Sequence, residues 1–447
     1  MKKIRLIGFS LALLLLAFWV GIPPLKTAVF NGPLHMDDVI DQQAIFKGLV
    51  RTHSFSQAWA WWTGPWVGYW GDGQVNSFYR PLTSLVWYTQ YRLWGPNGTW
   101  PFMVMHFVWH LVVCLLAVAF FRHIVGYRIA LAAIVIWASG FLFQLTLPAP
   151  QAALYWWKDD PDLWISISVL LTLWSLLSYW RTSKSRFLIS AVLFQIVGIA
   201  FKEMAYVTPV MAGLVLWSEW RKHRFAFQPR HWAPIVGLVS IVILAYIFRT
   251  WALQGPGFRF GSNGSWLERW VLYNIGGRSA SLALAGELGS TSMALTALGL
   301  AALAWKKWKA GAVVLACGLA LMLWFDGSRG QLFATPIQFL SSSPSVPFWK
   351  MPIVQDSLQA FLIFVLWTDF FNRRDPRQVF GYGWMLFAYL PLLTAPITEH
   401  ALYLPSMGWA LFLAVALDNV IRDIRAAVSK RKNREIGILQ PTPLEAT

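Results

Sequence analysis

Apolar runs long enough to cross a lipid bilayer recur along the whole sequence, and they decide what kind of fold the chain can adopt. A helix needs about 20 apolar residues to cross the ~30 Å hydrocarbon layer. Only 13% of the 447 residues are charged, whereas soluble proteins carry about 25%. The sequence therefore predicts an all-α polytopic membrane protein with about 12 transmembrane helices. We expect these helices at residues 4–22, 101–121, 128–148, 163–180, 186–201, 204–219, 233–252, 289–305, 310–325, 355–371, 379–396 and 402–420.

The distribution of basic residues predicts the orientation of these helices. With the N-terminus inside, most of the 37 Lys and Arg residues fall in the short segments on the inner side, as the positive-inside rule requires. The net charge of +17 then reports membrane orientation, and no nucleic-acid partner is expected. We predict a multi-pass protein of the bacterial inner (plasma) membrane with both termini in the cytoplasm. Residues 1–421 form the membrane domain, and residues 422–447 form a basic cytoplasmic tail.

Three loops on the predicted outer side are long, and the largest covers residues 23–100. Long loops on a compact helical bundle often carry function. Within this loop the stretch from Pro81 to Trp94 alternates apolar and polar residues, which predicts a helix lying in the membrane interface. The loop also holds a group of tryptophans, which serve either as interface anchors or as a platform for a sugar: Trp59, Trp61, Trp62, Trp66 and Trp70.

The same loop holds two features that could carry chemistry. Asp37 and Asp38 are adjacent carboxylates close to the first span, and mutual repulsion can raise the pKa of one of them, which suits a general base. An acidic helix N-cap is the alternative interpretation. Arg80 precedes a proline at the depth of the lipid phosphates, where it binds either a substrate phosphate or an ordinary lipid headgroup.

Further polar residues are predicted on this same side of the membrane, so they could line one cavity. Charged residues near a bilayer are expensive unless they are solvated or paired. His106 and His110 share one face of a span; we expect hydrogen bonds inside the bundle in preference to a metal site, and no metal ligand is assigned. The other candidates on this side are Asp160, Asp162, Lys202, Glu203, Glu399, His400 and Tyr403.

These features, taken in order along the chain, resemble a known family. The pattern comprises the acidic pair at 37–38, Tyr-Arg-Pro-Leu-Thr at 79–83, Leu-Trp-Gly at 93–95, the histidines at 106 and 110, Asp-Leu at 162–163, Lys-Glu-Met-Ala at 202–205 and Glu-His-Ala-Leu-Tyr-Leu-Pro-Ser-Met-Gly at 399–408. It is similar to that of the GT-C superfamily of polytopic glycosyltransferases. The closest resemblance is to transmembrane O-mannosyltransferases with tetratricopeptide repeats and to their bacterial relatives.

The resemblance implies a GT-C-like bundle that transfers a sugar, with inversion, from a polyprenyl-phosphate donor on the outer face. Carried over to this sequence, it makes Asp37 the catalytic base with Asp38 in support, and it places the donor phosphate on Arg80. We expect Lys202 and His400 to assist with that phosphate, although the family usually has Arg at the second position. No tetratricopeptide repeats follow, so a repeat-guided protein acceptor is not expected.

Two other functions stay open at this point. About twelve spans also suit a transporter or a flippase of a lipid-linked sugar, although we find no repeat between halves. A catalytically inactive GT-C relative is the third reading. The sequence identifies neither the sugar nor the acceptor, which is a glycan, a lipid or a protein. No cofactor is predicted, and a requirement for a divalent metal stays open.

Overall fold

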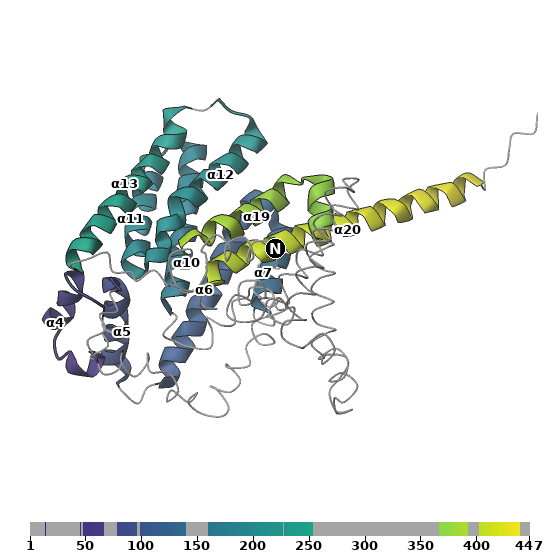
Figure 1. Cartoon of the computed structure of the whole chain (residues 1–447). Helices are drawn as coiled ribbons and strands as arrows, with labels where there is room; N and C mark the ends of the chain where they lie inside the picture. The colour runs from purple at the N-terminus through teal and green to yellow at the C-terminus, as the bar shows by residue number, and fades with distance from the viewer. Residues whose placement is uncertain are drawn as a thin grey trace, which may run out of the picture.

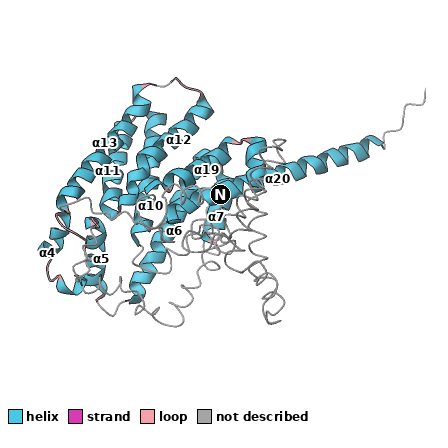
Figure 2. Cartoon of the chain, in the orientation of Figure 1, coloured by secondary structure: helices cyan, strands magenta, loops and turns pink. Residues whose placement is uncertain are grey.

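The computed structural model of the chain describes Leu14, Ile45 and residues 48–66, 78–95, 99–139, 160–226, 228–253, 366–391 and 402–438. All regular secondary structure in these ranges is helical, as predicted (Figures 1 and 2). The elements are α4 (Phe55–Trp59), η2 (Ala60–Trp62), α5 (Pro81–Trp94), α6 (Thr99–Val125), α7 (Tyr127–Ala138), α10 (Asp160–Thr182), α11 (Ser185–Phe201), η4 (Glu203–Val207), α12 (Thr208–His223), α13 (Pro229–Ala252), α19 (Pro376–Ala388) and α20 (Tyr403–Ile438).

Four of the described helices are long and apolar enough to span a membrane, in α6, α10, α13 and α20. This confirms the coarser prediction of a helical membrane protein. Two further apolar helices, α7 and α11, are shorter. The predicted spans at 4–22, 289–305, 310–325 and 355–371 lie wholly or largely outside the described residues.

Several helix ends follow from local sequence rules. Proline occupies the first turn of α5, α12, α13 and α19, where its missing N–H leaves no hydrogen bond unmade. The stretch from Pro81 to Trp94 forms α5 with the predicted bounds. Gly126 separates α6 from α7 with a φ of +91°, a backbone conformation that favours glycine.

The helices form one packed bundle. α10 runs along α11, and α6 packs against both α7 and α10, while α19 lies along α20. Figure 1 shows α11, α12 and α13 side by side, with α4 and α5 at one end of them. α20 starts inside the bundle and continues far beyond it. Residues 422–438, predicted as a tail, therefore continue this helix.

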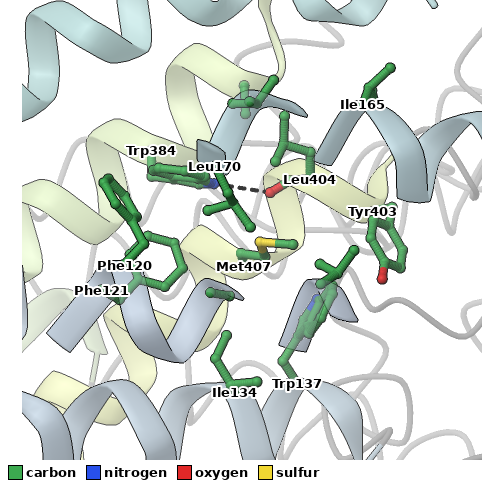
Figure 3. Close-up of a cluster of buried hydrophobic side chains, with 14 of the residues drawn as sticks. Phe120, Phe121, Ile134, Trp137, Ile165, Leu170, Trp384, Tyr403, Leu404 and Met407 are labelled. Atoms are coloured by element: carbon green, nitrogen blue, oxygen red, sulfur yellow. Dashed lines mark hydrogen bonds between the residues drawn. The ribbon is translucent and has the colours of Figure 1, made fainter. Parts of the chain in front are cut away.

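α19 and α20 cross with their backbones in close contact. A Cβ atom added at Gly408 would lie 2.5 Å from the Met385 nitrogen and 2.6 Å from the Gly381 oxygen. Small residues allow this approach between membrane helices. Large side chains surround the crossing (Figure 3), where the Trp384 indole N–H donates to the Leu404 carbonyl at 3.0 Å.

Candidate functional site

Eight buried polar residues lie at one end of the bundle, and we call them the buried polar cluster. Each is less than a tenth exposed. They come from the N-cap of α5, from α6, from the start of α10, from the turn between α11 and η4, and from the start of α20. The members are Arg80, His106, His110, Asp160, Asp162, Lys202, Glu203 and Tyr403.

Arg80 and Glu203 form a two-pronged ion pair inside this cluster. The Arg80 Nε donates to Glu203 Oε2 at 3.1 Å, and Nη2 donates to Oε1 at 3.0 Å. The guanidinium also lies over the rings of Phe78 and Trp66, at 4.2 and 5.0 Å from their centres. Burial raises the pKa of Glu203, but the charge and hydrogen bonds of Arg80 outweigh it and bring the pKa down to about 2. Glu203 is therefore a carboxylate at neutral pH.

Lys202 pairs with a different acid. Its Nζ donates to the two carboxylate oxygens of Asp162 at 2.6 and 2.8 Å. Lys202 and Glu203, which are adjacent in the sequence, are therefore bound to separate partners. The reason is local: Lys202 has an extended backbone with φ −163° and ψ 145°, and successive side chains of extended chain point in opposite directions.

The two histidines of α6 take part in hydrogen bonds within the bundle, as the sequence analysis expected. His106 Nδ1 contacts the Asp160 carboxylate. One turn further on, His110 Nδ1 lies 2.5 Å from the Tyr403 hydroxyl, and its Nε2 lies 3.6 Å from the Cys114 sulfur. Within the described ranges, no group of three or more His, Cys, Asp or Glu side chains has the geometry of a metal site.

These contacts are linked to one another by short steps along the chain. Arg80 binds Glu203, the neighbouring Lys202 binds Asp162, and Asp162 lies two residues after Asp160. Asp160 contacts His106 of α6, and His110, one turn further along α6, contacts Tyr403 of α20. The structure thus brings together all the described residues that the sequence predicted to line one cavity. Chemically, the cluster offers an arginine and a lysine whose carboxylate partners a bound anion could replace.

Arg249 belongs beside this cluster, and the sequence analysis missed it. It lies in the last turn of α13 and is 1% exposed. Its charge acts on Glu203 and on Tyr206. A signal was available, because Arg249 is a charged residue inside a predicted apolar span, and such residues mark functional positions by default.

A second ion pair with two parallel hydrogen bonds lies at the other end of α10. Arg181 donates to both oxygens of Glu219 at 2.9 and 2.8 Å. The 19 residues from Asp162 to Arg181 correspond to about 28 Å of helix, close to the thickness of a bilayer core. Arg181 is 37% exposed, so this pair reaches water, whereas Arg80 and Glu203 are almost fully enclosed.

The tryptophans of the first loop pack next to the cluster. Trp66 contacts Arg80 and also Trp87 of α5, whose ring centre lies 5.6 Å away. The Tyr79 hydroxyl donates to the Trp62 carbonyl at 2.9 Å, and burial raises the pKa of Tyr79 to about 12. Trp59 is 57% exposed. Trp66 therefore lies against Arg80, whereas Trp59 lies at the surface.

Four predicted site residues lie outside the described residues: Asp37, Asp38, Glu399 and His400. Their assignment therefore rests on the sequence. Trp70 lies outside these ranges as well.

No protein-family model matches the sequence, and a comparison with curated proteins found no match.

Proposed function

We propose that the chain is a membrane glycosyltransferase of the GT-C type, which transfers a sugar from a polyprenyl-phosphate donor to an acceptor on the outer face of the bacterial inner membrane. The observation that carries the proposal is the enclosed double ion pair of Arg80 with Glu203 and Lys202 with Asp162. Replacing a buried ion pair with apolar residues is often neutral or stabilising. Stability therefore does not explain why these four charged residues are buried together, whereas binding of an anion by Arg80 and Lys202 would explain it.

The positions of the two cations suit a lipid phosphate. Arg80 precedes α5 and Lys202 follows α11, and the Thr83 hydroxyl joins these helices by donating to the Phe201 carbonyl at 2.7 Å. An incoming phosphate would take over the hydrogen bonds that the carboxylates now accept. A guanidinium offers such an anion two parallel N–H groups, and an ammonium offers a mobile point charge. His400 is proposed as a third contact on the basis of the sequence.

The proposed reaction is a single displacement. An acceptor hydroxyl oxygen attacks the anomeric carbon, its proton passes to Asp37, and Asp38 supports that base. The bond between the anomeric carbon and the phosphate oxygen breaks, and polyprenyl phosphate leaves with the electron pair. Arg80 and Lys202 stabilise the charge that develops on this leaving group. The acceptor, a glycan, lipid or protein, would approach beside the tryptophans of the first loop.

The test is sugar transfer by the purified protein in lipid discs. Labelled polyprenyl-phosphate mannose, glucose and aminoarabinose are offered with cell-envelope extract as acceptor, and release of polyprenyl phosphate is measured. Arg80→Gln and Asp37→Asn are expected to lower the rate at least tenfold. Arg181→Gln is the matched control, because it removes the same kind of ion pair at the other end of the bundle and is expected to keep most of the activity.

The outcomes separate the candidate functions. Release by the wild type that is lost in Arg80→Gln but kept in Arg181→Gln supports the proposal. Equal losses in both arginine variants would mean that the pairs only stabilise the fold. Donor binding without release in any acceptor extract would favour a flippase or an inactive relative. Full activity of Asp37→Asn would move the base to Asp38 or to the acidic residues at the start of α10.

A further inference from the structure

The last part of α20 extends beyond the other helices that the structure describes. Every residue from Ile421 to Lys430 is exposed, whereas every residue from Leu411 to Ala416 is buried. Figure 1 shows this part of α20 running on alone past the other described helices. Its surface is therefore available to whatever surrounds the protein at this end.

One side of this part is fixed by polar contacts where it leaves the bundle. Asn419 donates to Asp369 at 2.9 Å, and Arg377 donates to Asp418 at 3.2 Å. Asp423 is paired with Arg373, in the helical stretch just before α19. These contacts set the rotation of α20 about its own axis, so the opposite side must face away from the protein.

That outward side carries a stripe of aliphatic side chains. Their spacing of three or four residues places them on one face of the helix. All are exposed, from 39% at Val420 to 63% at Val428. The members of this outward stripe are Leu417, Val420, Ile421, Ile424 and Val428. An aliphatic face in water is unfavourable, so the stripe requires an apolar neighbour.

The charges around the stripe indicate what that neighbour is. Residues 422–434 contain six basic residues and one acid, Asp423. The basic ones are Arg422, Arg425, Lys430, Arg431, Lys432 and Arg434. A helix with an aliphatic face and Lys/Arg on its flanks binds in the interface of membranes that contain anionic lipids. Association with another highly basic copy of the same segment would bring like charges together.

We propose that residues 417–434 of α20 lie in the interface of the membrane and bind anionic lipid headgroups. The outward stripe enters the acyl-chain region, and the side chains of Arg425 and Lys430 extend to the phosphates. The segment would hold α20 at a fixed depth and tilt, independently of any enzymatic activity. It would also make the position of this helix sensitive to the anionic lipid content.

The test measures which side of the segment contacts lipid. Spin labels are placed at Ile424→Cys and Val428→Cys, with Ala426→Cys as the control on the opposite face. The full chain, with Cys114 and Cys317 replaced by Ala, is reconstituted in discs that contain phosphatidylglycerol. The labels at 424 and 428 are expected to be accessible to oxygen and protected from a water-soluble nickel reagent. The label at 426 is expected to show the reverse.

Two further experiments test whether anionic lipid covers the stripe and whether the basic side chains recognise its headgroups. In discs of phosphatidylcholine alone, and in an Arg425→Gln/Lys430→Gln variant, the protection at 424 and 428 is expected to fall several-fold. Nickel accessibility equal at 424, 428 and 426 in anionic discs would overturn the proposal. A short distance between labels on two chains would overturn it too, since a second copy would then cover the stripe. Protection unchanged in phosphatidylcholine would refute the recognition of anionic headgroups.

Discussion

Replacing Arg80 with glutamine would leave the Glu203 carboxylate without its guanidinium partner, in a place where Glu203 is only 10% exposed. Breaking a buried pair in this way costs about 3–5 kcal/mol, because one charge stays buried without compensation. The pKa of Glu203 points the same way, because burial raises it and the charge and hydrogen bonds of Arg80 lower it. Arg249 also lowers this pKa and would still compensate part of the charge. We therefore expect Arg80→Gln to lower the free energy of unfolding by about 3 kcal/mol, at the low end of that range.

This expectation can be checked by equilibrium unfolding in mixed micelles of dodecylmaltoside and SDS, followed by tryptophan fluorescence. Arg92→Gln is the matched control, because Arg92 lies on the same helix but is exposed; it should change stability by about 0.5 kcal/mol or less. The double variant Arg80→Gln/Glu203→Gln should recover most of the loss, since it removes both charges of this pair. A loss below about 1 kcal/mol for Arg80→Gln, or a double variant no more stable than the single one, would refute the buried pair.

The pH dependence gives a further check on the same pair. Because the pKa of Glu203 is lowered in the folded state, its contribution is fully present above the unfolded value of about 4.5 and is lost as the pH falls toward 2. The stability difference between the wild type and the Arg80→Gln/Glu203→Gln double variant, which has no titrating group at position 203, should therefore be constant from about pH 5 to pH 8 and shrink below about pH 4.5. A difference that shrinks between pH 5 and pH 8 would contradict this assignment.

Three other substitutions probe the packing and the hydrogen bonds. Gly408→Ala should destabilise the protein by about 1–3 kcal/mol, because the new methyl group would meet the Met385 backbone nitrogen at 2.5 Å; the same unfolding titration measures it. Gly126→Ala should cost about 1–3 kcal/mol for a different reason, since the φ of +91° is strained for alanine although the space is open. Tyr403→Phe should cost about 1–3 kcal/mol by removing the hydrogen bond to His110, which the same unfolding titration measures.

Gly213→Ala serves as the control for both glycine variants. Gly213 lies within α12, and an added Cβ would meet nothing within 4 Å. Alanine favours a helix by about 1 kcal/mol over glycine, so this variant should be as stable as the wild type or more stable. If Gly408→Ala behaved like Gly213→Ala, then α19 and α20 would not cross as closely as described.

Much of the fold and of the site could be predicted, because both depend on local patterns. Proline and apolar periodicity predicted α5 with its observed bounds, and length and hydropathy predicted α6, α10 and α13. The common side of the charged residues predicted that Arg80, Asp162 and Glu203 would converge. The predicted total of about 12 spans and the bond-forming role of Asp37 stay predictions, as neither is covered by the described residues.

The pairing within the cluster could not be predicted, because it depends on three-dimensional neighbours. Lys202 and Glu203 are adjacent in the sequence, but the extended backbone at Lys202 directs their side chains to different helices. Arg249 was not predicted as a site residue, because it is the one charged residue in a span that was identified by its apolar composition. The continuation of α20 past residue 421 was missed because its basic residues suggested a tail, while helix propensity and the outward stripe keep it helical.

The pairs within the buried polar cluster have a consequence for how the chain enters the membrane, because the partners of each pair are synthesised in a fixed order. Asp160 meets His106, and Glu203 meets Arg80; both partners are synthesised first. Asp162 meets Lys202, which closes the same α10–α11 hairpin. Each of these acids therefore has its hydrogen-bonding partner already synthesised or within its own hairpin, so none depends on a helix that is made later. The α10–α11 hairpin can thus enter the bilayer with the carboxylates at its buried end already hydrogen-bonded.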